Sequence, residues 1–217
     1  MFRVDLHTHS VASPDGGISM RQYRKAFETG LLDCIAITDH NRIDFATQAK
    51  AELGERIIIG EEIMTTLGEI VGLYLSEVVQ PGQTPGETIA AIKAQDGIVY
   101  IPHPFETIRK GLHPATLDAI ANDVDIVEVC NGRALAQNRS QQALVWSKLN
   151  AISAAASSDA HGLHGLGRTY TSLAEIPTQD NLVKLVNQGV MNTSRAVLRS
   201  LLYPKYHTMR KKLSKRT

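Results

Sequence analysis

Two histidines near the start of the chain are the first residues whose spacing indicates chemistry. His7 and His9 directly follow residues 2–6, a run typical of a short strand. Side chains two residues apart on a strand point to the same face, so both imidazoles face one way. Neutral ring nitrogens are good ligands for zinc, manganese or iron. The pair therefore indicates a metal site at the end of the first strand.

Acids and histidines recur just past the later strand-like runs. In chain order these further residues are Asp15, Asp39, His40, Glu61, Glu62, His103, Asp159 and His161. Barrel enzymes build their active sites from the loops at the carboxyl ends of their strands. Five of the eight histidines fall at such positions, and we therefore expect these side chains to converge on one pocket.

The elements that must position these residues alternate along the whole chain. Short apolar runs at 34–38, 56–59, 69–75, 98–101, 125–129 and 151–155 are typical of buried parallel strands. Helical patterns lie at 19–29, 84–97, 116–121, 133–148 and 181–188. This alternation predicts an α/β domain with a parallel sheet. Six or seven such units favour a barrel, and no Gly-x-Gly-x-x-Gly turn follows the first strand to support a dinucleotide fold.

The charge of the chain is unevenly distributed. The 217 residues carry a formal charge of +1, but residues 195–217 contain eight Lys/Arg and no acid, which leaves −7 for residues 1–194. An acidic body suits multivalent cations, because buried carboxylates need partners. We expect one domain at 1–194 and a basic C-terminal tail at 195–217. The tail is either solvated or attracts nucleic acid or an anionic membrane surface.

Cysteine content and hydropathy indicate the compartment. Cys34 and Cys130 are the two cysteines, and they form neither a disulfide framework nor a Cys-x-x-Cys pair. The N-terminus has no apolar signal region, and no run approaches the ~20 apolar residues of a membrane helix. These features predict a cytoplasmic protein without a membrane span.

Five motifs in order resemble those of one known family. They are His-x-His at 7–9, Thr-Asp-His at 38–40, Gly-x-Glu-Ile at 60–63, His-Pro at 103–104 and Ser-Asp-Ala-His at 158–161. As a set they resemble the PHP (polymerase and histidinol phosphatase) family of metal-dependent phosphoesterases, over roughly residues 2–194. The resemblance implies an α/β fold, a distorted seven-stranded (β/α) TIM-like barrel, with two or three divalent ions (Zn, Mn or Fe).

The resemblance also implies a ligand set. The first ion would be held by His7, His9, Glu62 and Asp159, the second by Glu62 and His103, and the third by Asp15, His40 and His161. Glu62 is preferred to Glu61 because it directly precedes Ile63. Asp15 stands where some members have histidine. Around 128–131 some relatives supply another histidine, where this chain offers only Asn131 or Cys130 as a ligand.

Three further residues are candidates for catalytic roles. Asp39 precedes His40 and would either orient an imidazole or bind a metal directly. Arg133 and Arg168 follow strand-like runs among glycines. A guanidinium there would either grip a phosphate or form a structural salt bridge.

The leading hypothesis is a metal-dependent phosphoric ester hydrolase acting on a small phosphorylated metabolite or nucleotide. A 3'-5' exonuclease-like nuclease, for which the basic tail is the support, is one alternative. A non-catalytic, metal-stabilised PHP module that binds a partner is another. An amidohydrolase-like enzyme is disfavoured, because no lysine falls at a strand end.

Overall fold

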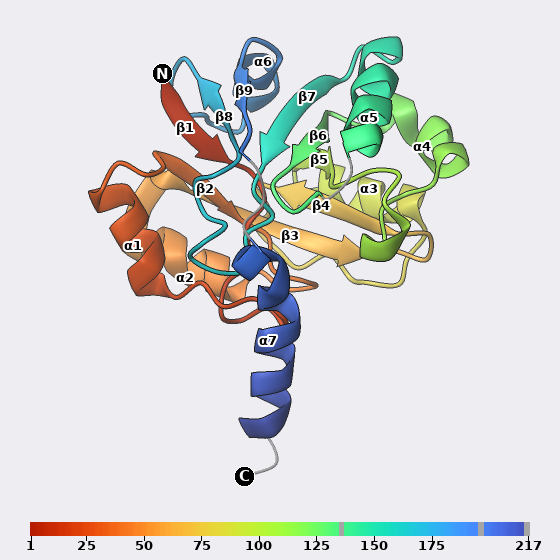
Figure 1. Ribbon diagram of the computed structural model, residues 1–217. Helices are drawn as coiled ribbons and strands as arrows, with labels where there is room; N and C mark the ends of the chain where they lie inside the picture. The colour runs from red at the N-terminus through yellow and green to blue at the C-terminus, as the bar shows by residue number, and fades with distance from the viewer. Residues whose placement is uncertain (135–136, 195–197, 215–217) are drawn as a thin grey trace.

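The computed structural model describes residues 1–134, 137–194 and 198–214. One sheet of nine strands curls into a nearly closed barrel (Figure 1). The strands are β1 (Phe2–Asp5), β2 (Cys34–Ile37), β3 (Ile57–Met64), β4 (Glu69–Leu73), β5 (Ile98–Ile101), β6 (Ile126–Asn131), β7 (Ser153–Ser157), β8 (Tyr170–Leu173) and β9 (Val190–Asn192).

The strands follow the order β7-β6-β5-β4-β3-β2-β1-β8-β9. The pairs β1–β2, β2–β3, β5–β6 and β6–β7 are parallel, whereas β4 runs antiparallel to both neighbours. The barrel closes beside β7, where Thr171 Oγ1 bonds both the amide and the carbonyl of Ala156. A parallel bridge between Thr8 and Ala160 completes the junction.

All seven strand-like runs of the sequence form strands, but the sheet has nine strands, so a seven-stranded barrel is not confirmed. Two further strands, β8 and β9, extend the sheet beyond β1, and both run antiparallel to their neighbours. The parallel sheet predicted from the sequence is also interrupted at β4, which runs antiparallel to β3 and β5. This reversal places the first residue of β4, Glu69, at the same rim as the carboxyl ends of the neighbouring strands.

Helices cover the outside of the barrel. They are α1 (Met20–Glu28), α2 (Asp44–Leu53), α3 (Pro85–Lys93), α4 (Pro114–Ile120), α5 (Gln137–Leu149), α6 (Leu182–Asn187) and α7 (Leu198–Ser214), with 3-10 turns at Gly54–Arg56, Thr107–Arg109 and Ala121–Asp123. A capping box opens α3, where Thr84 Oγ1 accepts from the Glu87 amide and Glu87 accepts from the Thr84 amide. Gly30, with φ of +64°, ends the turn after α1.

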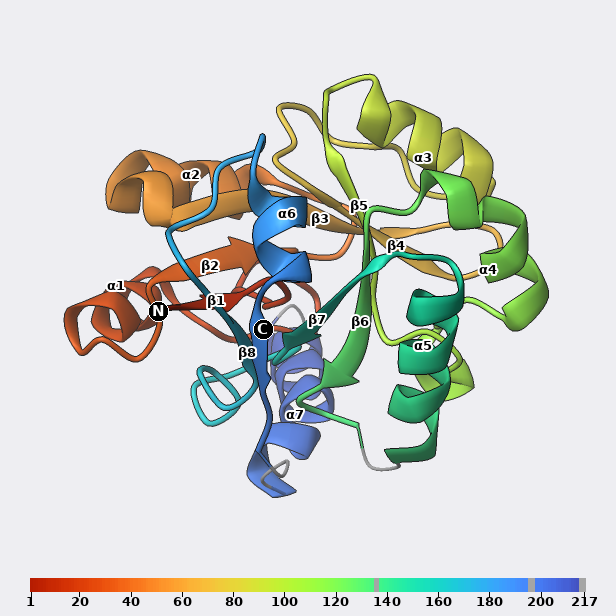
Figure 2. The same cartoon turned by 90° about the horizontal axis from the view of Figure 1, so that it is seen from above.

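Alternating side chains of each strand build an inner and an outer core. On β2, Cys34 and Ala36 join the inner apolar cluster, whereas Ile35 and Ile37 pack against α1 and α2. Leucines of α6 belong to the inner cluster. Figure 2 shows α6 over one end of the barrel, and the opposite end is left for the polar residues.

Residues 198–214 of the basic tail form a helix. Helix α7 projects from the body (Figure 1), and residues 195–197 and 215–217 of the tail lie outside the described residues. None of the helices in the described part of the chain is long and apolar enough to cross a bilayer.

Candidate metal centre

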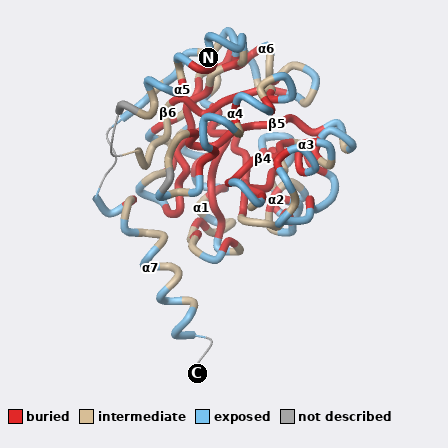
Figure 3. The backbone as a smooth tube through the Cα atoms, turned by 90° about the vertical axis from the view of Figure 1, so that its right-hand side faces the viewer, coloured by how far each residue is buried: buried red, intermediate tan, exposed pale blue. Residues whose placement is uncertain are grey.

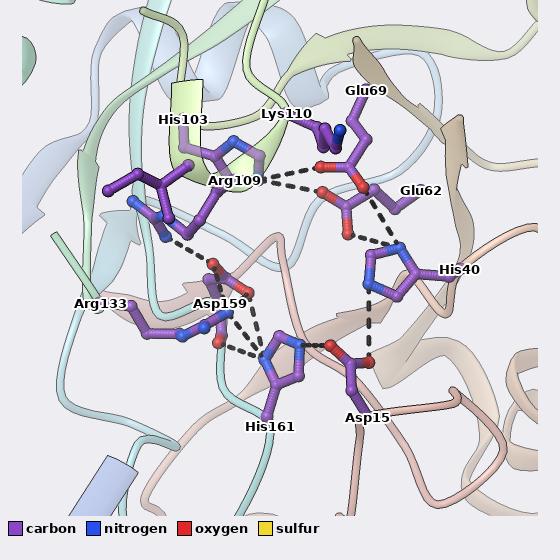
Figure 4. Close-up of a pocket in the computed structure, with 11 residues that line it drawn as sticks. Asp15, His40, Glu62, Glu69, His103, Arg109, Lys110, Arg133, Asp159 and His161 are labelled. Atoms are coloured by element: carbon purple, nitrogen blue, oxygen red, sulfur yellow. Dashed lines mark hydrogen bonds and ion pairs between the residues drawn. The ribbon is translucent and has the colours of Figure 1, made fainter. Parts of the chain in front are cut away.

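One pocket at the carboxyl end of the barrel gathers most of the predicted site residues. It has a volume of about 220 Å³ (Figure 4). Its walls are formed by Asp15, His40, Glu62, Glu69, His103, Ile108, Arg109, Lys110, Arg133, Asp159 and His161. His7 and His9 are fully buried and contact Glu62 and Asp159. Residues separated by up to 154 positions, from His7 to His161, therefore meet at one place.

Four ligand atoms enclose a space suited to one ion. His7 Nε2 lies 3.1 Å from His9 Nε2 and 3.4 Å from Glu62 Oε2. His9 Nε2 lies 3.2 Å from that carboxylate oxygen, and Asp159 Oδ1 lies 3.7 Å from His7 Nε2 and 3.5 Å from His9 Nε2. Bonds of 2.0–2.2 Å to a tetrahedral zinc require ligand separations of about 3.3–3.6 Å. The four side chains therefore fit a divalent cation.

A second set of ligand atoms adjoins the first. Glu62 Oε1 lies 3.1 Å from His103 Nε2, and Glu62 Oε2 lies 3.2 Å from His40 Nδ1. Glu69 faces the same two imidazoles, at 3.8 Å from His103 and 3.7 Å from His40. Glu62 thus adjoins both groups, with Oε2 beside His7, His9 and His40 and Oε1 beside His103, and a carboxylate in this position can bridge two ions.

A third set lies on the other side of His40. Asp15 Oδ2 is 3.0 Å from His161 Nε2, and Asp15 Oδ1 is 3.6 Å from His40 Nε2. Together with His9, these residues offer ligand atoms that all lie within 4.8 Å of one another. Aspartate at position 15 therefore reaches the place where the resemblance implies a ligand.

Backbone conformation at two candidate ligands is unusual. Asp159 has φ of +50° and His103 has φ of +28°, a region that costs most non-glycine residues free energy. Such positions cluster at functional sites, where the surrounding structure compensates for the strain. The observation supports a role for both side chains at the site.

Glu128 orients the imidazole of His7. Its Oε1 accepts from His7 Nδ1 at 3.2 Å and from the Tyr100 hydroxyl at 3.0 Å, and its Oε2 accepts from the His103 amide at 2.7 Å. A proton on Nδ1 leaves the Nε2 lone pair of His7 directed at the ligand group.

We expect Glu128→Gln to weaken metal affinity about 10- to 100-fold, because the amide no longer fixes that tautomer as a carboxylate does. Titration of the metal-free variant with zinc measures the change. An unchanged affinity would contradict an orienting role for Glu128.

The candidate ligands bind protons in competition with a metal. Burial disfavours charge on His7, but Glu62, Asp159 and Glu128 outweigh it and raise the pKa of His7 well above its usual value. The same competition raises the pKa of His9 to about 9. Burial, reinforced by the charge of Glu62, raises the pKa of Glu69 to about 9. Burial and the neighbouring His9 lower the pKa of His161 to about 4.

Metal binding at pH 7 should therefore release protons. His7 and His9 are protonated below their raised pKa values, and each nitrogen must lose its proton to become a ligand. We expect about one to two protons per chain to leave. Calorimetric titration with zinc in two buffers of different ionisation enthalpy measures the number, which should fall as the pH rises past 9. Identical heats in both buffers would mean that no protons are released, which would contradict metal binding by protonated His7 and His9.

Three cationic side chains line the same pocket. Arg109 Nη1 lies 2.7 Å from Asp159 Oδ2, and Arg133 Nη1 lies 3.2 Å from the same oxygen. Nε of Arg133 is buried without a hydrogen-bond partner among the described residues. Lys110 completes the cationic wall. Together the three supply the positive charge that an anionic ligand needs.

Four predicted residues have other partners, although Asn131 adjoins the site and its Nδ2 donates to Asp159 Oδ2 at 3.3 Å. Asn131 Oδ1 accepts from Arg109 Nη1 and from the Arg133 amide, so its oxygen is occupied and we do not propose it as a ligand. Cys130 belongs to none of the ligand groups found among the described residues. Arg168 is exposed, bonds the His164 carbonyl and does not line the pocket. Asp39 accepts from the amide and hydroxyl of Ser10 and thereby orders the loop after His9.

Sequence reasoning assigned no role to several residues of the site. Arg109 and Lys110 lie eight and nine residues beyond β5, at the end of the 3-10 turn Thr107–Arg109, which is too far from the strand end for the strand-end rule to identify them. Glu128 was identifiable as the single acid in the apolar run of β6, with a side chain that is 2% exposed. Glu69 opens a strand instead of following one, so it departs from the pattern used for the other ligands.

The chain is similar to a known sequence family and to an uncharacterized relative. Residues 138–191 match a sequence family described as PHP-associated. The chain is 39% identical over 142 residues to the uncharacterized protein MJ1587 of Methanocaldococcus jannaschii, covering 59% of this chain and 81% of that protein.

Solved structures share the fold. A two-domain protein from Bacteroides vulgatus, described as containing a predicted PHP-like metal-dependent phosphoesterase, superposes with a TM-score of 0.71 at 20% identity, over 95% of this chain and 69% of that one. An amidohydrolase from Chromobacterium violaceum with bound sulfate superposes with a TM-score of 0.59 at 15% identity, over 93% of this chain and 96% of that one.

Proposed function

This chain belongs to the PHP family, and from that premise we propose that it is a metal-dependent phosphoesterase acting on a small phosphorylated metabolite or nucleotide. We assign the activity to residues 1–194 and treat residues 195–217 as a separate basic segment. The observation that carries the proposal is the spacing of the ligand atoms of His7, His9, Glu62 and Asp159, beside a wall of cationic side chains.

The proposed site would hold two or three divalent ions, with zinc, manganese and iron as candidates. The first would be held by His7, His9, Glu62 and Asp159, the second by Glu62, Glu69, His103 and His40, and the third by Asp15, His161 and His40. When bound, such ions acidify a water nucleophile and stabilise negative charge on the ester oxygens. Phosphate-ester hydrolysis needs this help, because its uncatalysed barrier is very high.

The protein's own cations would bind and orient the phosphate. Arg133 contacts Asp159 through Nη1, and its Nε has no hydrogen-bond partner among the described residues, so Arg133 is the better placed of the two to bind a ligand oxygen. Arg109 is held by Glu106, Asn131 and Asp159 and contributes mainly its charge. Guanidinium groups bind phosphate through paired hydrogen bonds, and Lys110 adds a point charge. A pocket of about 220 Å³ suits a small ester better than a long polynucleotide, which needs an extended groove.

A substrate screen tests the proposal. Purified protein with added manganese or zinc is assayed against phosphomonoesters, phosphodiesters, oligonucleotides and N-acyl substrates. We expect hydrolysis of a small phosphate ester. Cleavage of oligonucleotides alone would support the nuclease alternative, cleavage of an amide alone would support amidohydrolase chemistry, and full metal occupancy without hydrolysis would overturn the enzymatic assignment.

Phosphate recognition has its own test. Arg133→Met should raise KM for the ester by about 10- to 100-fold, because a charged hydrogen-bond donor is lost. Arg168→Met is the matched control, since Arg168 is exposed and lies outside the pocket lining. Equal effects of the two substitutions would contradict a binding role for Arg133.

A further inference from the structure

Helix α7 carries an apolar stripe on one face. Five large side chains, Leu198, Leu202, Tyr206, Met209 and Leu213, are each between 55% and 71% exposed. At about 100° per residue, these positions fall within an arc of about 80°. Figure 3 shows α7 projecting from the body.

The opposite face of α7 holds the helix to the body. Lys211 Nζ donates to the carbonyls of Val11 and Gly16, each at 2.8 Å, and to that of Ser13. The Tyr203 hydroxyl lies 2.7 Å from His164 Nδ1. These contacts fix the rotation of the helix, so the apolar stripe points away from the body.

Basic side chains flank the stripe on both edges. With the same rotation of about 100° per residue, Lys205 and Lys212 lie beside one edge of the stripe, and Arg199 and Arg210 lie beside the other. All four are exposed, and α7 contains no acidic residue. Long basic side chains extend their charge toward lipid headgroups while their stems lie against apolar surface.

We propose that α7 lies on an anionic lipid membrane, with the stripe among the acyl chains and the flanking Lys/Arg at the headgroups. An apolar face bordered by Lys/Arg is the pattern of helices that lie in a membrane interface. A second copy of the chain would bring two strongly basic helices together, which is electrostatically unfavourable. A nucleic acid would pair with the charges but leave the apolar stripe in water. The proposal is independent of the phosphoesterase assignment.

Vesicle flotation of the full chain tests this proposal. We expect the protein to float with vesicles of phosphatidylcholine and phosphatidylserine, and at least about tenfold less with phosphatidylcholine alone. The double substitution Leu202→Gln, Met209→Gln should reduce binding to anionic vesicles at least about tenfold, because it removes apolar surface without changing charge.

The matched control replaces two exposed apolar residues elsewhere. Val145 and Leu149 of α5 are 57% and 80% exposed, and Val145→Gln, Leu149→Gln should leave flotation unchanged. Three results would overturn the proposal. The first is that the protein does not float with anionic vesicles. The second is that the stripe and control variants lose vesicle binding to the same extent. The third is that ultracentrifugation without vesicles shows a dimer, and that the stripe substitutions dissociate it.

Discussion

Glu62→Gln is expected to lower kcat/KM for the best phosphate ester by at least about a thousandfold. Glu62 Oε2 lies 3.2 Å from both His9 Nε2 and His40 Nδ1, and its other oxygen lies 3.1 Å from His103 Nε2. A single side chain therefore serves two neighbouring ligand groups. Glutamine keeps the shape but loses the charge, and its amide nitrogen cannot bind a cation. Steady-state kinetics with metal analysis of the purified variant measures both losses.

The preceding residue provides a matched control. Glu61 is also buried in β3, but its carboxylate accepts from the Val79 amide at 2.8 Å and belongs to no ligand group among the described residues. Burial raises the pKa of Glu61 to about 7, so a neutral amide there is a mild change. Glu61→Gln should keep activity within about threefold of the parent. If it is as damaging as Glu62→Gln, the effect is structural and the bridging role fails.

Removing the metal ions should lower the melting temperature by on the order of 10 °C. Asp15, Glu62 and Asp159, whose pKa values are lowered, line one small pocket, and a cation that binds them only in the folded chain stabilises the folded state. A ligand present at about a thousand times its Kd adds about 4 kcal/mol to the free energy of unfolding. In a chain of this size each kcal/mol shifts the melting temperature by about 2–4 °C. Thermal unfolding with and without a chelator measures the shift.

Specificity of the thermal effect is checked in two ways. Zinc or manganese added back after removal of the chelator should restore the original transition. Glu62→Gln should respond less to chelation than the parent chain, because it has less bound metal to lose. A melting temperature that is the same with and without chelator would indicate that the carboxylate cluster does not hold a cation tightly.

Much of the fold could be predicted because buried strands and capped helices have local signatures. The seven continuous apolar runs all form strands. β8 and β9 were not predicted because neither forms a continuous apolar run. β8 alternates buried and half-buried residues, and β9 exposes Val190 and Met191. α2 escaped because the residues it buries, Ala46 and Ala49, give a weak apolar period.

The candidate ligands could be predicted because the carboxyl ends of parallel strands lie at the same rim of the barrel. That rule depends on topology and not on side-chain detail. Arg109 and Lys110 could not be found in this way, because nonlocal contacts shape their loop. The Glu69 amide donates to the Lys110 carbonyl, and the Phe105 amide donates to the Leu112 carbonyl. The surroundings of Asn131 depend on Arg109 in the same way, since that guanidinium occupies the amide oxygen.

Anomalous diffraction from crystals grown with manganese or zinc tests the central claim most directly. The account predicts a strong anomalous peak enclosed by His7, His9, Glu62 and Asp159, with further density beside His103 or between Asp15 and His161. Crystals that contain the metal but show no peak among these four side chains would contradict it.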